Sequence, residues 1–173
     1  MQAKKVSESK VEMTEMVMPN DTNPLGNLMG GNLMRWMDVA GSICAARHCG
    51  AHVVTASVDH LSFQRPIRLG HVVVIKACVT RAFHTSLEIF LEVETGNPTR
   101  TERHIANHAY MTFVALDEDT KKPKQVPELI PETEAEKRLY EGAVRRRELR
   151  LVLAGKLKVQ DASELRALFT NLK

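Results

Sequence analysis

A run of small side chains within one apolar, helix-periodic segment restricts how this chain can fold. Apolar residues recur at helical spacing, at Leu33, Met37, Ala40 and Cys44. Alanine, glycine and serine fill the second half of that segment, and glycine inside a helix costs about 1 kcal/mol relative to alanine. Gly41 therefore needs a packing reason, such as a curved sheet that lies close to the helix backbone. The pattern predicts one such helix, which ends at Gly50.

Only extended segments follow this helix until about residue 118. They have strand length and are bounded by turn residues such as Gly70 and Gly96. We expect strands over residues 53–63, 72–80, 87–93 and 105–115, and another over residues 11–18 before the helix. One helix followed by consecutive antiparallel strands is an α+β order with the helix against one sheet face. Helices are too few for a doubly wound parallel sheet.

The 173 residues fit one domain with a tail. We expect residues 1–10 to be disordered and residues 11–118 to form the domain. Residues 119–132 contain three prolines and several charges, which indicates a linker. A C-terminal helical tail is expected over residues 133–173. Thr133 is placed to cap its first helix.

Composition limits the class of protein and its expected location. With 43% hydrophobic and 26% charged residues, the chain is too apolar for disorder and too charged for a membrane protein. No apolar run approaches the roughly 18 residues that cross a bilayer, so no membrane partner is expected. The N-terminus lacks the apolar segment of a secretory signal. Three cysteines cannot all pair within one chain, so we expect free thiols and a cytoplasmic location.

The net charge of +3 comes with a basic stretch between Lys137 and Lys158. Nucleic-acid binding favours a basic footprint with aromatic side chains beside it, and Tyr140 is the single aromatic residue of this stretch. No nucleic-acid partner is therefore expected. A solvated helix face is the favoured interpretation, and attraction to an anionic ligand or partner is the alternative.

Common catalytic and metal-binding motifs are missing from the sequence. It has no GxSxG, no phosphate-binding loop, no GxGxxG, no HExxH and no CxxC. The most metal-like string runs from Cys44 to His52, but zinc sites favour a tight cysteine pair with a distant second pair. We therefore expect buried thiols and surface histidines in this string, and no metal.

A polar cluster surrounds the start of the predicted helix. Asp38 lies within an apolar helical strip, where a carboxylate is costly unless it is exposed, paired or used. Gly30 and Gly31 precede the strip. Glycines at a helix N-terminus leave N–H groups that can polarise a thioester or ester carbonyl oxygen. An exposed-face aspartate and a tight turn into the helix are the alternative interpretations.

The segment from Met18 to Gly41, MPNDTNPLGNLMGGNLMRWMDVAG, resembles the loop and central helix of hotdog-fold acyl-CoA thioesterases. The resemblance is to the brain-type acyl-CoA hydrolase family and its bacterial single-domain relatives. Further matching segments are residues 58–70, 85–88 and 110–117, and the resemblance extends over about residues 11–150. His71 departs from the pattern, which commonly has aspartate after the glycine.

This resemblance implies the hotdog fold, an antiparallel sheet wrapped around a long central helix, here with a C-terminal helix added. It also implies hydrolysis of acyl-CoA to a free acid and CoA. At matching positions, Asp38 would be the general base or nucleophile, and Asn23 would position water or the thioester. The amides of Gly30 and Gly31 would hold the oxyanion. Acyl-CoA is the implied substrate, and no metal or bound cofactor is implied.

The resemblance further suggests residues that contact the CoA portion of the substrate. Thr85 and Ser86 are expected to contact the pantetheine or the nucleotide, while Arg65 and Arg103 are candidates for phosphate contacts. A surface role is the alternative for both arginines. Alternative functions are an acyl-carrier-protein thioesterase, a dehydratase and a non-catalytic acyl-CoA-binding regulatory protein. Dehydratases of this fold usually use a histidine, and the predicted helix has none before His48.

Helix geometry also predicts that one chain does not make a complete site. Gly31 and Asp38 are 7 residues apart, hence roughly 10 Å along a helix axis. A thioester carbon must lie within about 3–3.5 Å of its attacker. We therefore expect the two groups of one helix to serve different sites. In a homodimer with antiparallel central helices, Asn23 and the glycines of one chain can face Asp38 of the other. The hotdog resemblance implies such a dimer, and often a trimer of dimers.

Overall fold

The computed structural model describes residues 1–59, 61, 63 and 65–170. It divides the chain into two compact units, Met1–Ile130 and Pro131–Lys173. The first unit contains the sheet and the central helix, and the second is helical. The boundary falls near the end of the stretch expected to be a linker.

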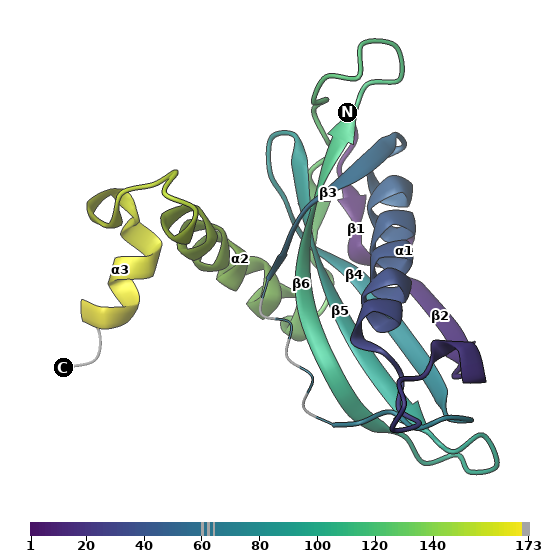
Figure 1. Cartoon of the computed structure of the whole chain (residues 1–173). Coiled ribbons are helices and arrows are strands. Elements are labelled where there is room, and N and C mark those ends of the chain that lie inside the picture. The colour runs from purple at the N-terminus through teal and green to yellow at the C-terminus, as the bar shows by residue number, and fades with distance from the viewer. Residues whose placement is uncertain (60, 62, 64, 171–173) are drawn as a thin grey trace. The chain divides into compact units, whose positions relative to one another are not determined.

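The first unit is built on a five-stranded antiparallel sheet (Figure 1). Its strands lie in the order β2-β4-β5-β6-β3, so β2 and β3 form the two edges. This is the antiparallel α+β arrangement expected from the sequence. The strands are β2 (Val11–Met16), β3 (His52–Asp59), β4 (Val72–Ala82), β5 (Ser86–Gly96) and β6 (His104–Leu116).

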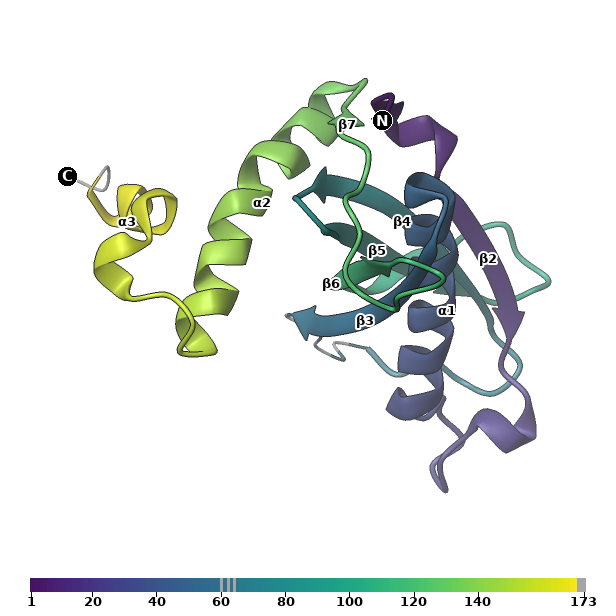
Figure 2. The same ribbon diagram turned by 90° about the horizontal axis from the view of Figure 1, so that it is seen from above.

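Helix α1 (Gly30–Cys49) lies against one face of this sheet and contacts all five strands. The sheet curves around the helix, so that β2 and β3 lie on either side of it (Figure 2). The helix ends where predicted, at Gly50, whose φ is 60° and whose N–H donates to the Ala46 carbonyl at 2.8 Å. A left-handed residue at this position favours glycine. The wrapped sheet and the central helix are therefore confirmed.

The close approach predicted at Gly41 is present. A Cβ atom added there would lie 2.8 Å from Cζ and 2.9 Å from Cε2 of Phe113, which belongs to β6 and is fully buried. The ring fills the space that a side chain would need. The core between α1 and the sheet is completed by apolar residues that include Leu33, Trp36, Met37, Ala40, Ile75, Val79, Leu87, Ile89, Leu91, Val93, Ala109 and Met111.

Helix α1 begins at Gly30, so Gly30 and Gly31 lie at the helix N-terminus and do not form the tight turn of the alternative interpretation. Some strand boundaries differ from those expected. The strand expected over residues 11–18 is β2, which ends at Met16. The strand expected over residues 53–63 is β3, which ends at Asp59. Residues 60 and 62 of that expected strand lie outside the described residues.

The N-terminus is ordered where disorder was expected. Strand β1 (Lys4–Lys5) pairs in parallel with β7 (Leu129–Ile130), and a 3-10 turn follows at Val6–Glu8. Val6 is 1% exposed, so its apolar side chain joins the core and offsets the entropy of ordering the segment. Because β7 falls within residues 119–132, that stretch supplies part of the first unit as well as a connection.

The second unit contains α2 (Glu134–Leu153), the 3-10 turn Val159–Asp161 and α3 (Ser163–Thr170). Thr133 caps α2 as predicted. Its Oγ1 accepts a hydrogen bond from the Glu136 N–H at 3.2 Å, while Glu136 Oε2 accepts from the Thr133 N–H at 3.0 Å. Helices α2 and α3 contact each other. Within the described part of the chain, no helix is both long and apolar enough to span a bilayer.

Candidate active site

The loop before α1 is held in place by Asp21. The Asp21 carboxylate accepts a hydrogen bond from the Met18 N–H at 3.0 Å, and the Asp21 carbonyl accepts from the Met29 N–H at 2.8 Å. Met29 is the residue directly before α1. These two bonds fix the loop to the first turn of the helix, and the loop carries the candidate residue Asn23.

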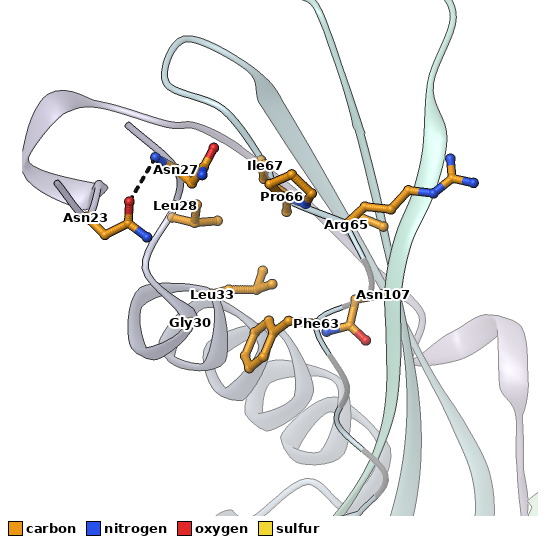
Figure 3. Close-up of a pocket in the computed structure, with 11 residues that line it drawn as sticks. Asn23, Asn27, Leu28, Gly30, Leu33, Phe63, Arg65, Pro66, Ile67 and Asn107 are labelled. Carbon is orange, nitrogen blue, oxygen red and sulfur yellow. Dashed lines mark hydrogen bonds between the residues drawn. The ribbon is translucent and has the colours of Figure 1, made fainter. Parts of the chain in front are cut away.

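Asn23 is oriented by its own loop. Its Oδ1 accepts a hydrogen bond from the N–H group of Leu25 at 3.0 Å. It also accepts one from the N–H group of Asn27 at 3.2 Å, which is the bond drawn in Figure 3. With Oδ1 engaged in this turn, the Nδ2 group is the part of the side chain left to donate outward. The residue is half-buried and lines a cavity. It is therefore suited to donate a hydrogen bond to an oxygen atom of a ligand, rather than to accept a proton.

Gly30 and Gly31 form the first turn of α1, where no helix carbonyl can accept from their N–H groups. A Cβ at Gly30 would lie 2.9 Å from Cζ of Phe63, so that aromatic ring packs directly on the helix start. At Gly31 nothing lies within 4 Å of an added Cβ. The open N-terminus of the helix can receive an oxygen that carries negative charge.

The first cavity has a volume of about 370 Å³ and lies beside the helix N-terminus. Figure 3 shows its walls, formed by the loop before α1, the first turns of α1, residues near Pro66, and β6. Most of its surface is apolar. The lining residues are Asn23, Asn27, Leu28, Gly30, Leu33, Phe63, Arg65, Pro66, Ile67, Ala106 and Asn107.

Asp38 lies in a second cavity of about 300 Å³, which is also mostly apolar. Thr55 on β3 donates a hydrogen bond from its Oγ1 to Asp38 Oδ1 at 2.5 Å. This bond fixes one carboxylate oxygen and leaves Oδ2 available to a ligand. The cavity is lined by Gly31, Met34, Arg35, Met37, Asp38, Val58, Leu61 and Met111.

A single chain does not bring all the candidate catalytic residues together. Asn23 and Gly30 line the first cavity, whereas Gly31 and Asp38 line the second. Gly31 and Asp38 share a helix face but remain about 10 Å apart along the axis, at about 1.5 Å per residue. Each chain therefore presents Asn23 and the Asp38 carboxylate at different places.

The four candidate CoA contacts do not lie together within one chain. Arg65 lines the first cavity, and exposed Arg103 comes directly before β6, near Gly96 at the end of β5. Thr85 and Ser86 lie at the opposite end of β5, an 11-residue strand. At about 3.4 Å per residue, this separation is roughly 34 Å. One chain therefore does not offer all four residues to the same part of a ligand.

The cysteine and histidine string at the end of α1 differs partly from expectation. Cys44 and Cys49 are free and buried as expected, and burial raises the pKa of the Cys44 thiol to about 12. His48, expected on the surface, is instead fully buried. Its Nε2 atom lies 3.0 Å from the Pro127 carbonyl oxygen, which satisfies that ring nitrogen. No cluster of three or more potential metal ligands occurs among residues 1–59, 61, 63 and 65–170.

Two polar residues of the candidate site were not singled out from the sequence: Thr55, which bonds to Asp38, and Asn107, which lines the first cavity. Thr55 follows two valines in a β-rich segment and gives no local sign that it faces Asp38. Asn107 lies between Ala106 and His108, where a strand asparagine could equally face solvent. Only the register of β3 and β6 against α1 reveals their positions.

A central helix wrapped by an antiparallel sheet, with an open helix N-terminus and a fixed carboxylate beside cavities, defines a hotdog-fold protein equipped for acyl-transfer chemistry. Over residues 25–102 the sequence matches the Thioesterase superfamily. It is 43% identical over 139 residues to the uncharacterised acyl-CoA thioester hydrolase YkhA of Bacillus subtilis (strain 168), with 80% of each chain covered.

Solved structures agree with this assignment. An acyl-CoA hydrolase from Staphylococcus aureus, in complex with butyryl coenzyme A, coenzyme A and coenzyme A disulfide, matches with a TM-score of 0.82 and 38% identity, over 89% of this chain and 95% of that one. An apo-hexameric acyl-CoA thioesterase matches with a TM-score of 0.85 and 37% identity, over 89% of this chain and 98% of the other. The chain belongs to the thioesterase superfamily, among its hotdog-fold acyl-CoA thioester hydrolases, and the resemblance seen in the sequence is confirmed.

Proposed function

We propose that this protein hydrolyses acyl-CoA thioesters and that Asp38 activates the attacking group. The observation that carries the proposal is the Asp38 carboxylate, fixed by Thr55 at 2.5 Å within a mostly apolar cavity. Acting as a general base, Asp38 takes a proton from water while the water oxygen bonds to the thioester carbon. The C–S bond then breaks, the proton passes to the CoA sulfur, and a carboxylic acid is released. Direct attack by Asp38, followed by hydrolysis of the resulting anhydride, is the covalent alternative.

The remaining groups act on the thioester carbonyl. Asn23 donates from Nδ2 to the carbonyl oxygen, because its Oδ1 is already engaged by Leu25 and Asn27. The N–H groups of Gly30 and Gly31 stabilise the same oxygen as negative charge develops on it. All of these groups are supplied by the protein, so the proposed reaction uses water and no metal or bound cofactor.

Two chains complete each site in this proposal. Asn23 and Asp38 line separate cavities, and the surface around Asp38 is apolar and exposed. Its large exposed residues on α1 and β3 are Met34, Val39, Ile43 and Val58, each 40–41% exposed. Because β3 is an edge strand, a second copy can pair with it antiparallel, extend the sheet and cover this apolar face. The pairing places Asn23 and Gly30 of one copy against Asp38 of the other.

We further propose a trimer of such dimers, in keeping with the hexameric state named for one similar thioesterase structure. Sedimentation equilibrium should then give a mass six times the 19.4 kDa of the chain. Replacing Val54 and Val58 by lysine should reduce the assembly to smaller species by placing charge in the proposed dimer interface. A hexamer that persists in this variant would place the dimer contact elsewhere.

The activity is tested by thiol release from butyryl-, hexanoyl- and palmitoyl-CoA. Asp38→Asn should lose about 10² or more in kcat and still bind CoA, since it loses the group that activates water. Asn23→Ala should cost less, because Asn23 orients and polarises without reacting. Glu12→Gln, an exposed carboxylate change on β2, serves as the control. CoA binding without thiol release from any ester would indicate a binding protein instead.

The two-chain site is tested by mixing the two inactive variants. A heterodimer of Asn23→Ala and Asp38→Asn chains contains one intact site and one doubly damaged site. Activity should therefore recover to about half that of the native dimer per heterodimer, provided subunits exchange. Confirmed heterodimers without any recovery would place both residues of a working site on one chain.

The proposal also assigns residues that contact CoA. Arg65 at the first cavity and the exposed Arg103 are proposed phosphate contacts, and charge reversal at both should raise KM. Thr85 and Ser86 are proposed to contact CoA held mainly by the partner chain, because they lie at the far end of β5.

The free, buried Cys44 and Cys49 favour a reducing compartment, so we propose the cytoplasm as the location of the protein.

A further inference from the structure

Asn107 is a buried amide without a partner in the wall of the first cavity. It is 3% exposed, and neither its Oδ1 nor its Nδ2 has a hydrogen-bond partner within the described part of the chain. Figure 3 shows its side chain at the cavity beside Phe63, across from the loop that carries Asn23. Buried amides in folded proteins are nearly always satisfied, so this one calls for a ligand.

The strand register places Asn107 on the helix side of the sheet. The pairing of β5 with β6 is continuous from Val93–Asn107 to Leu87–Phe113. Asn107 and Phe113 are six positions apart, so they face the same side of β6. Phe113 packs against α1 at Gly41, and Asn107 therefore also faces the interior, towards the end of the cavity near the helix N-terminus.

The immediate surroundings of Asn107 are mainly apolar. Leu33, Phe63 and Ile67 line the same cavity, and Leu33 and Ile67 are themselves buried. An amide in such a wall costs free energy in the empty protein, and the cost is recovered only when a polar ligand group reaches it. A small number of polar groups in an apolar pocket typically fixes the orientation of a ligand.

We propose that Asn107 hydrogen-bonds the acyl-CoA a few bonds away from the thioester and orients it for attack. This inference rests on the proposed function, because the oxygen-polarising groups Asn23 and Gly30 line the same cavity. The group it recognises carries a hydrogen-bonding N–H, C=O or O–H. Two parts of an acyl-CoA supply one: the amide of the pantetheine arm nearest to the sulfur, and a hydroxyl or oxo substituent on the acyl chain. Asn107 is a positioning residue and does not itself react.

The test compares the native protein with Asn107→Leu, which keeps the side-chain size and removes the amide. Steady-state kinetics are measured with butyryl-CoA and 3-hydroxybutyryl-CoA, and calorimetry measures binding of CoA. We expect kcat/KM to fall about tenfold, the loss typical of one hydrogen bond left unmade. An equal fall for both esters with weaker CoA binding assigns the pantetheine amide, whereas a fall confined to 3-hydroxybutyryl-CoA assigns the acyl substituent. Unchanged kcat/KM for both esters overturns the inference.

A matched control separates recognition from general damage to β6. Thr112 lies on the same strand, five positions on and therefore on the opposite face, and its buried Oγ1 also lacks a partner among the described residues. Thr112→Val should leave kcat/KM unchanged. Equal losses in Thr112→Val and Asn107→Leu would overturn the inference, because they would reflect strand damage.

Thermal unfolding provides a second readout. Asn107→Leu should have a melting temperature equal to or above that of the native protein, because it removes a buried amide without a partner. If Asn107→Leu does not fold, Asn107→Ala undergoes the same assays with the same expected losses. If the native protein releases no CoA from any ester, the proposed function fails. Calorimetric binding of the two intact esters then decides the role of Asn107, with weaker binding by the variant supporting the inference and equal binding overturning it.

Discussion

Replacing Gly41 by alanine should destabilise the protein, although alanine favours helices. The new Cβ would lie 2.8 Å from Cζ of Phe113, whereas carbon atoms prefer about 3.5–4.0 Å. The ring would have to move by roughly 0.7 Å or more within a fully buried site. Overpacking of this kind costs about 1–3 kcal/mol, and the helix-propensity gain offsets about 1 kcal/mol. We therefore expect the free energy of unfolding to fall by about 1 kcal/mol.

Urea unfolding at a fixed protomer concentration measures this change, since the proposed assembly makes stability depend on concentration. A double-mutant cycle isolates the contact. In a Phe113→Leu background the steric conflict is removed, so Gly41→Ala should become stabilising by about 1 kcal/mol. A stabilisation of that size in the native background would refute the reasoning, because it would show that the ring does not occupy the space above Gly41.

Three further predictions concern the site and the end of α1. Thr55→Val should lower kcat about tenfold or more in thiol-release assays with a smaller effect on KM, because Asp38 loses the charge-assisted hydrogen bond that orients it; an unchanged kcat would remove Thr55 from the site. Burial lowers the pKa of His48 below its usual value of 6.5. The unfolded chain therefore takes up a proton more readily than the folded protein, and the free energy of unfolding should decrease as pH falls below about 6.5. In urea titrations between pH 7 and 5, His48→Gln should show a flatter decrease. Cys44, with its pKa raised to about 12 by burial, should resist iodoacetamide at pH 8 in the native protein and react in urea, as read by mass spectrometry; rapid native labelling would contradict its burial.

The sequence predicts much of the fold because periodicity encodes burial. The spacing from Leu33 to Cys44 identifies the helix face that packs on the sheet, and Gly50 ends the helix where its φ of 60° favours glycine. The small residues around Gly41 anticipate the close contact with Phe113. These features depend on neighbouring residues along the chain, which a sequence displays directly.

Structural features that depend on contacts between distant segments could not be predicted from the sequence in this way. Lys4 and Lys5 look like part of a polar tail until Leu129 and Ile130 are placed beside them. The prediction of a surface position for His48 was wrong. Its partner is a backbone carbonyl, and because every residue has one, the sequence does not show which carbonyl accepts the bond.

The candidate site shows the same division between local and distant information. Asp38 stands out because a carboxylate interrupts an apolar helical strip, and the glycine pair marks the start of the helix. Asn107 gives no such signal, since its lack of a partner depends on how β6 packs in three dimensions. A residue whose type is unexpected in its segment, such as Asp38, can therefore be identified from the sequence. A residue whose significance depends on what packs around it, such as Asn107, can be identified only from the structure.

The pairing of β1 with β7 also sets an order of events during protein synthesis. Lys4 pairs with Leu129, so the ribosome releases one partner long before it has made the other. Until about residue 130 has emerged, the nascent chain carries an open N-terminal segment, and the central helix and main sheet can assemble without it. Closing the two-stranded ribbon is thus the final step in completing the first unit. A message that ends before codon 129 would yield a chain whose N-terminal strand has no place to pair.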